Sequence, residues 1–292
     1  MSQKNENYKS ESPWQIGWRH FKKNKLAVTG LILLTIIILS AIFAPVLAPH
    51  DPNNTNILKA KQAPNSEFLL GTDRVGRDIL SRLLYGGRVS ITVGIVAMSI
   101  SVTLGTFIGL IAGYFGGWVD TILSRIIDVF RSIPFLVMAI TIGAIWGPGL
   151  YKLMVIIGVL SWTGVARLVR GRVLTLRERE FIHASRALGS SDLRVMLKHL
   201  FPNSLAPIIV NATLRVAYSI LSEAGLSYLG LGIMPPTASW GSMLNAARSV
   251  SVLESMPWFW VPPGIMIILT VLSINFVGDG LRDALDPKLQ KS

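Results

Sequence analysis

Polar side chains recur along one face of an otherwise apolar segment between residues 207 and 229. They stand three or four residues apart, and one acidic residue flanks them: Asn211, Arg215, Ser219, Ser222 and Glu223. In an α-helix this spacing places them within about a quarter of the circumference. Ionisable groups at membrane depth are costly, so they normally face a bundle interior or a water-filled path. We therefore expect this face to line a translocation path or to contact a partner subunit; alternatively, Arg215 extends toward the membrane surface.

Catalytic and metal chemistry find little support elsewhere in the chain. The four histidines lack metal-ligand spacing, there is no cysteine, and three acidic residues are expected to be solvated in or beside an outer loop: Asp51, Asp73 and Asp78. The phosphate-binding pattern Gly-x-x-x-x-Gly-Lys-Ser/Thr is absent, so ATP would have to be bound by other chains. We expect no cofactor in this chain and no hydrolytic activity.

The composition predicts a membrane protein made of helices. The 292 residues are 51% hydrophobic and only 15% charged, whereas soluble domains carry about 25% charged residues. A membrane-spanning helix needs about 20 apolar residues. Six segments approach that length, and they predict an all-α bundle of six spans: 26–47, 91–114, 119–146, 150–168, 207–229 and 261–278. In the third, Arg125, Asp128 and Arg131 can pair along one face.

Flanking segments complete the predicted organisation. Residues 1–25 should form a cytoplasmic segment, with an amphipathic helix from Ser12 that presents Trp14, Trp18 and Phe21 to the headgroup layer; a disordered basic tail is the alternative. The first span, 26–48, is then an uncleaved anchor. Residues 49–90 form an extracytoplasmic loop, with a brief helix at 78–85. Residues 91–281 form a five-helix core, and 282–292 a cytoplasmic tail.

Basic residues in short loops set the orientation of a membrane protein. Much of the net charge of +12 lies in the N-terminal segment, in the loop 170–205 and in the C-terminal tail, which six spans place on one side. That side is predicted to be cytoplasmic. The loop 49–90 also carries basic residues, which acidic neighbours partly offset. Because the position of the basic residues is explained by the orientation of the protein in the membrane, we do not expect nucleic-acid binding.

Small residues recur at every fourth position of the second predicted span, which lets another helix approach closely. This packing seam consists of Ala97, Ser101, Gly105, Gly109 and Gly113. Packing within the subunit and packing against a partner subunit are both open.

The loop 170–205 is predicted to hold two short helices joined at a glycine. The first covers residues 174–188 and ends at Gly189, a residue suited to a helix C-cap. The second begins near Asp192, and Pro202 should end it. Its apolar stripe is formed by Leu193, Met196, Leu197 and Leu200. An apolar stripe that lipid does not cover indicates a protein partner; a DNA-reading helix-turn-helix is a weaker alternative, because the segment is tethered between two spans.

This loop resembles the EAA loop of ABC-importer permeases, whose pattern is Glu-Ala-Ala, three residues, Gly, nine residues, then Ile-x-Leu-Pro. Ala184, Gly189 and Pro202 match at the same spacing. The departures are His183 for Glu, Ser185 for the second Ala, His199 for Ile and Phe201 for Leu. In the family the loop forms a coupling helix that sits in a groove of the ATPase subunit. The resemblance thus implies a contact made by Phe181, His183, Ala184, Ser185, Ala187, Leu188, Gly189 and Pro202.

Four further segments resemble the dipeptide, oligopeptide and nickel branch of that family, and in particular its second permease. They are residues 70–82, 226–236, 239–241 and 278–287. The resemblance implies a heterodimer with a homologous permease, two cytoplasmic ATPases that bind ATP and Mg, and an external substrate-binding protein. It implies peptide import by alternating access in a bacterial inner membrane, with nickel or another small solute as the alternative substrate.

Three other functions fit the sequence less well. An ion-driven secondary transporter would need a substrate site between related halves, and we find no internal symmetry. An intramembrane enzyme would need catalytic residues that are missing, and a purely structural scaffold would not need the coupling loop.

Overall fold

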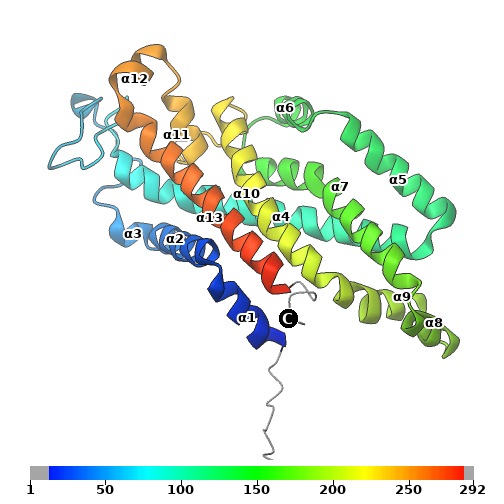
Figure 1. The fold of residues 1–292 in the computed structure, drawn as a ribbon. Coiled ribbons are helices and arrows are strands. Elements are labelled where there is room, and N and C mark those ends of the chain that lie inside the picture. Colours follow the sequence, from blue (N-terminus) through cyan, green and yellow to red (C-terminus); the bar gives the residue numbers. More distant parts are fainter. Residues whose placement is uncertain (1–12, 286–292) are drawn as a thin grey trace, which may run out of the picture.

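The computed structural model describes residues 13–285, in which the only regular structure is helical (Figure 1). The expected helix cap at Ser12 lies outside this range. The long elements are α1 (Pro13–Lys23), α2 (Lys25–Ile42), α4 (Ile79–Phe115), α5 (Gly117–Ser132), α6 (Phe135–Trp146), α7 (Leu150–Arg177), α10 (Phe201–Tyr228) and α13 (Val261–Leu285). The shorter ones are α3 (Ala44–Leu47), η1 (Ile57–Lys59), α8 (Glu180–Ala187), α9 (Asp192–Val195), η2 (Met196–Leu200), α11 (Trp240–Ala246), α12 (Val250–Ser255) and η3 (Pro257–Phe259).

Five helical stretches are long and apolar enough to cross a membrane: Lys25–Ile42, Ile79–Phe115, Leu150–Arg177, Asp192–Tyr228 and Val261–Leu285. A sixth crossing would come from α5 and α6 together, which are bent by 83°. The expected third span is therefore wrong as one continuous helix. Ile133 is extended and Pro134 caps α6, because proline lacks an N–H and disfavours helical geometry in the preceding residue.

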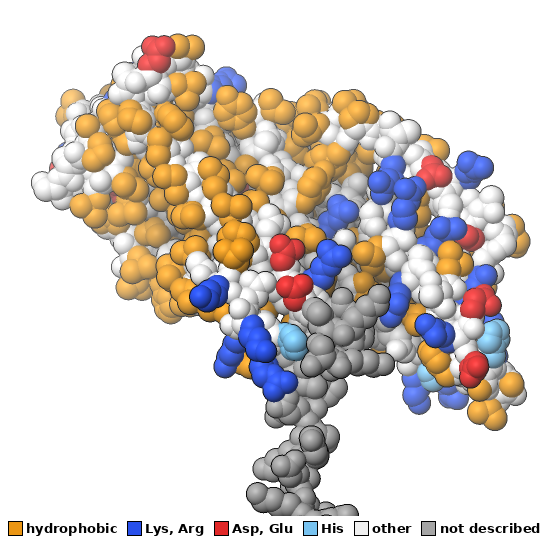
Figure 2. All heavy atoms as spheres, viewed as in Figure 1, with side chains coloured by type: hydrophobic (Ala, Val, Ile, Leu, Met, Phe, Trp, Pro, Cys, Tyr) orange, Lys and Arg blue, Asp and Glu red, His pale blue; other side chains and the backbone are white. Residues whose placement is uncertain are grey.

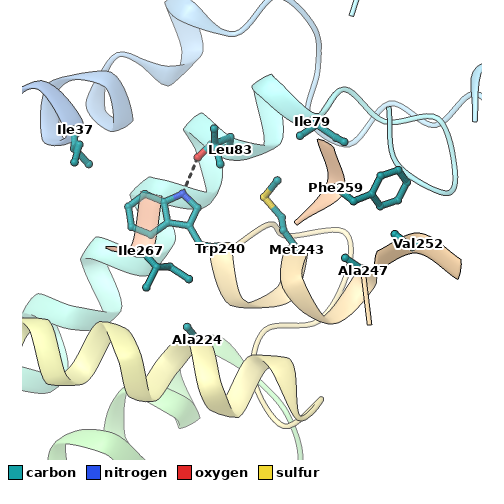
Figure 3. Close-up of a cluster of buried hydrophobic side chains, with 10 residues drawn as sticks. All are labelled: Ile37, Ile79, Leu83, Ala224, Trp240, Met243, Ala247, Val252, Phe259 and Ile267. Carbon is teal, nitrogen blue, oxygen red and sulfur yellow. Dashed lines mark hydrogen bonds between the residues drawn. The ribbon is translucent and has the colours of Figure 1, made fainter. Parts of the chain in front are cut away.

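Helix α4 lies at the centre of the bundle. It packs along α7 on one side and contacts α10 and α2 on others, while α13 packs between α2 and α10 (Figure 1). We name the two ends of the bundle after their short helices, the α8 end and the α12 end. At the α12 end a buried cluster joins the outer elements to the bundle (Figure 3). Its Trp240 is fully buried, and the indole Nε1 donates a 3.1 Å hydrogen bond to the Leu83 carbonyl.

Three expectations about residues 49–90 need correction. The brief helix expected at 78–85 is the first part of α4, which continues without a break to Phe115. Asp73 and Asp78 were expected to be solvated, but they are 6% and 2% exposed. Asp78 caps α4 by accepting the Ser81 N–H at 2.8 Å, and Asp73 pairs with Arg77 at 2.7 Å. These carboxylates are buried because they satisfy backbone and guanidinium donors.

The loop between α7 and α10 also differs from the prediction. Helix α7 extends to Arg177, the chain turns at Glu178 and Arg179, and α8 then begins, so no single helix covers 174–188. Pro202 does not end the second helix. The chain continues through the π-helical η2 into α10, and Phe201 N–H bonds the Met196 carbonyl. The wider π-turn accommodates a proline that has no N–H to donate.

Candidate functional site

The glycine junction between α8 and α9 is closed by a Schellman motif. Gly189 has φ +78°, its N–H bonds the Arg186 carbonyl at 2.9 Å, and Ser190 N–H bonds the Ser185 carbonyl at 3.1 Å. A left-handed residue is needed at this position, and glycine adopts that conformation without steric cost. The motif fixes the direction in which α9 leaves α8.

The expected coupling residues lie on the outside of this junction. Phe181 and Leu188 are 45% and 87% exposed, and His183, Ala184, Ala187, Gly189 and Pro202 are also exposed, while Ser185 is half-buried. The predicted apolar stripe is divided. Leu193 and Leu197 remain exposed, at 62% and 55%, whereas Leu200 is completely buried. We call the exposed residues Phe181, Leu188, Leu193 and Leu197 the coupling patch.

Residues that the sequence analysis missed hold the coupling patch against the bundle. Ile182 and Val195 are fully buried in a cluster with residues of α4 and α7. Tyr114, near the end of α4, donates a 2.6 Å hydrogen bond to Asp192, and the Arg186 guanidinium lies 4.7 Å from the Tyr114 ring centroid. The sequence analysis placed Asp192 only at the start of the second helix, and nothing in the sequence pairs it with Tyr114. The loop is thus attached to α4 on both sides of Gly189.

The small-residue seam of α4 packs against α7 of the same subunit. Ala97, Ser101, Gly105, Gly109 and Gly113 are all buried. A Cβ atom added at Gly105 would lie 2.5 Å from the Val165 Cβ, and one at Gly109 would lie 2.6 Å from the Ala166 carbonyl oxygen. The sequence left open whether the seam packs within the subunit or against a partner subunit, and in the structure it packs within the subunit.

The polar face of α10 does not form one continuous lining. Ser219, Ser222 and Glu223 are buried within the subunit, whereas Asn211 and Arg215 are partly accessible. Arg215 lies in an open hollow of about 330 Å³ between α5, α6, α7 and α10. The structure therefore leaves Arg215 and Asn211 as candidates for a path-lining or partner-facing role.

Glu223 belongs to a buried network that ties three helices together. Its Oε2 accepts a 2.9 Å bond from the Ser90 hydroxyl of α4, and its Oε1 accepts a 2.8 Å bond from Ser227. The Ser90 hydroxyl oxygen in turn accepts a 3.2 Å hydrogen bond from the backbone N–H of Trp240 in α11. Glu223 is 0% exposed, so it is enclosed within this subunit and its contacts indicate a structural role, while the expected place on a translocation path or subunit contact stays a prediction.

Comparison with known proteins identifies the family. Residues 105–291 match the model of the binding-protein-dependent transport system inner membrane component, and residues 12–64 match the N-terminal TM domain of oligopeptide transport permease C. The chain belongs to this family of inner-membrane transport components.

Relatives of this inner-membrane component match over almost their whole length. It is 46% identical over 97% of its chain to a protein of Alkalihalophilus pseudofirmus named dipeptide transport system permease protein DppC, of which 92% is covered. It is 42% identical, with the same coverage, to the Bacillus subtilis oligopeptide transport system permease protein OppC. A solved structure of the inward-facing MetNI methionine ABC transporter matches with a TM-score of 0.56 at 18% identity, covering 71% of this chain and 98% of that one. This last likeness shows the fold, so the predicted all-α membrane architecture is confirmed.

Among residues 13–285, no three histidine or acidic side chains come together in a way that could hold a metal ion. What the described part of the permease does contain is an exposed apolar patch at one end and a cationic hollow beside α10. These two features are the candidate sites for contact with other molecules.

Proposed function

We propose that this permease forms one half of the membrane path of an ATP-driven peptide importer. The observation that carries the proposal is the match, over nearly the whole chain, to permeases named for dipeptide and oligopeptide transport. In this proposal a second, homologous permease supplies the other half of the path. An extracytoplasmic binding protein delivers the peptide, and two cytoplasmic ATPases bind ATP and Mg. Nickel or another small solute remains the alternative substrate.

The coupling patch is the proposed contact with one ATPase. An apolar surface at an otherwise charged end of a membrane protein favours a protein partner. Closure of the ATPase pair on ATP would push on α8 and α9, and this movement would pass into α10, which follows without a break. Hydrolysis would then reset the path. His183 stands where the family pattern has Glu, so this contact cannot use an acidic group at that position.

The distribution of charge supports placing the α8 end in the cytoplasm of a bacterium. In Figure 2 Lys and Arg side chains gather around α8 and α9 and beside α1, whereas hydrophobic side chains dominate the surface over α2 and α13. Basic residues are retained on the cytoplasmic side of bacterial inner membranes. Both termini would then be cytoplasmic. The apolar surface of α2 and α13 would face lipid.

Purification and uptake test the proposal together. Isolation in mild detergent should retain a second permease and two ATPases, and the complete system in vesicles should import a labelled peptide only with ATP and the binding protein. Accumulation of the peptide by this chain alone, without nucleotide, would instead indicate a secondary transporter. ATP-dependent uptake of nickel but not of peptide would select the alternative substrate.

A further inference from the structure

Two guanidinium groups line the hollow beside α10 without an acidic partner. Arg215 reaches it from α10 and Arg131 from the last turn of α5. Within the described residues 13–285, neither forms an ion pair, although six other pairs of Lys or Arg with an acidic side chain are present. Asp128, which could pair with Arg131 along α5, pairs instead with Arg167 of α7 at 2.6 Å. The hollow therefore carries two positive charges that nothing in this part of the chain neutralises.

The hollow lies deep along the helices that form it. Arg131 follows the start of α5 by 14 residues, and Gly164 precedes the end of α7 by 13. At 1.5 Å per residue, each lies about 20 Å from the end of its helix nearest the α8 end. Arg215 of the continuous helix Asp192–Tyr228 lines the same hollow and therefore lies at the same depth. A charge at this depth normally faces a bundle interior or a water-filled path rather than lipid.

The walls of the hollow are built to leave Arg215 available. A Cβ atom at Gly164 would lie only 2.1 Å from the Arg215 Nη2, so the glycine makes room for the guanidinium. The Arg215 guanidinium lies 5.6 Å from the Tyr218 ring centroid, a cation–π arrangement that holds the group without neutralising it. Ser161 also lines the hollow, is 5% exposed, and has a hydroxyl oxygen without a hydrogen-bond partner.

We propose that Arg215 and Arg131 bind the carboxylate of the peptide during its passage, with Ser161 as an additional donor. The inference rests on the proposed function, because it assigns the substrate group that this site recognises. Guanidinium groups match the planar carboxylate and can bind it through two parallel hydrogen bonds. A hollow of about 330 Å³ has room for the terminal residue of a peptide, and aromatic side chains of α5, α6 and α10 border it. Helix α6 begins at the same hollow, and the N-terminal end of a helix also favours a negative group.

The test compares a free carboxylate with its neutral analogue on the assembled transporter. Binding of Ala-Ala-Ala and of its C-terminal amide is measured by calorimetry with the complete complex in nanodiscs, without the binding protein. The wild-type complex should bind the acid at least about tenfold more tightly than the amide, as expected for a charge-assisted hydrogen bond. R215Q and R131Q should remove most of this preference, because they should weaken the binding of the free acid but not that of the amide. R215K should restore part of the preference.

Two further variants separate the effect of the position of the Arg215 guanidinium from the effect of positive charge in general. G164A should reduce the preference for the acid, because the added methyl group displaces the Arg215 guanidinium while the net charge stays the same. R172Q is the matched control, since Arg172 is exposed on α7 but does not line the hollow. It should leave the preference unchanged.

The carboxylate site would be overturned if the variants bound the acid and the amide more weakly by the same factor. It would also be overturned if the wild-type complex showed no preference for the acid. Loss of the second permease from R215Q but not from R215K would overturn it as well, because an acidic side chain of the partner would then occupy the hollow. If R215Q and R215K both fail to assemble, R131Q and G164A decide the question. Peptide uptake by the complete wild-type system is checked separately. Its absence would refute the proposed function, whereas uptake with an unchanged preference in the variants would refute only this site.

Discussion

Replacing Gly189 with valine should uncouple the transporter without removing the permease from the membrane. Gly189 has φ +78°, and a Cβ atom added there would meet nothing within 4 Å. The substitution therefore acts through backbone conformation and not through a clash inside the subunit. Valine disfavours the left-handed region, so the Schellman bonds from Gly189 and Ser190 would break and α9 would leave α8 in another direction.

The size of the effect follows from the backbone energy. The left-handed conformation costs an ordinary L-residue about 1–2 kcal/mol, which lowers the population of the observed junction about 5- to 30-fold. If only this geometry transmits movement, ATP-dependent uptake should fall by a similar factor. Asparagine tolerates the left-handed region, so G189N should retain most uptake although its side chain is as bulky as valine.

Uptake and ATPase activity are measured on the reconstituted complex, together with the amount of ATPase that copurifies. G171A is the control for loss of a glycine, because Gly171 is helical, exposed and also free of neighbours within 4 Å of its Cβ position. It should transport normally. Normal uptake by G189V would refute the coupling role, and equal loss in G189N and G189V would show that bulk against a partner matters and not the backbone conformation.

Three further changes test the packing around the sites. G109L should destabilise the permease by about 1–3 kcal/mol or more, because a Cβ atom there lies 2.8 Å from that of Val169; an unchanged melting temperature in detergent would contradict the tight seam. E223A should lower stability by about 1–3 kcal/mol for each of the two serine hydroxyls that lose their acceptor, and E223Q by less; equal melting temperatures would argue against the network. Y114F removes the bond to Asp192 and should speed hydrogen exchange in α9 and η2, while exchange at wild-type rates would show that this bond does not hold the loop.

The sequence predicted most of the membrane architecture, because apolar length is a direct consequence of bilayer thickness. It also predicted the glycine junction, since glycine is favoured where φ is positive. Two of the errors concern prolines, whose effect depends on the neighbouring backbone. Pro134 breaks a stretch that was expected to be one span, whereas Pro202 follows a π-turn and breaks nothing. The local rule for proline is the same at both positions, and only the neighbouring backbone decides the outcome.

The polar face of α10 shows a second limit of sequence reasoning. Helical spacing gives the angular position of Arg215 and Glu223, but not the elements that cover them. Glu223 is enclosed because Ser90 and Trp240, both far away in sequence, meet it in space. Arg215 remains accessible because α5 ends at the break before Pro134. Tertiary packing thus divides a stripe that appears uniform in the sequence.

The continuous helix from Asp192 to Tyr228 connects the two candidate sites physically. Its 37 residues extend over about 55 Å at 1.5 Å per residue, with the coupling patch at one end and Arg215 about two-thirds of the way along. Had Pro202 ended the helix, movement of the loop could have been absorbed by a flexible joint. Instead, the helix continues past Pro202 and Pro207, so a displacement of α9 is expected to shift or tilt α10. Because Glu223 fastens α10 to α4 and α11 beyond Arg215, that end of the helix is held. In the proposed function, a push by the ATPase at the coupling patch would therefore move Arg215 relative to Arg131 and open or close the cationic hollow.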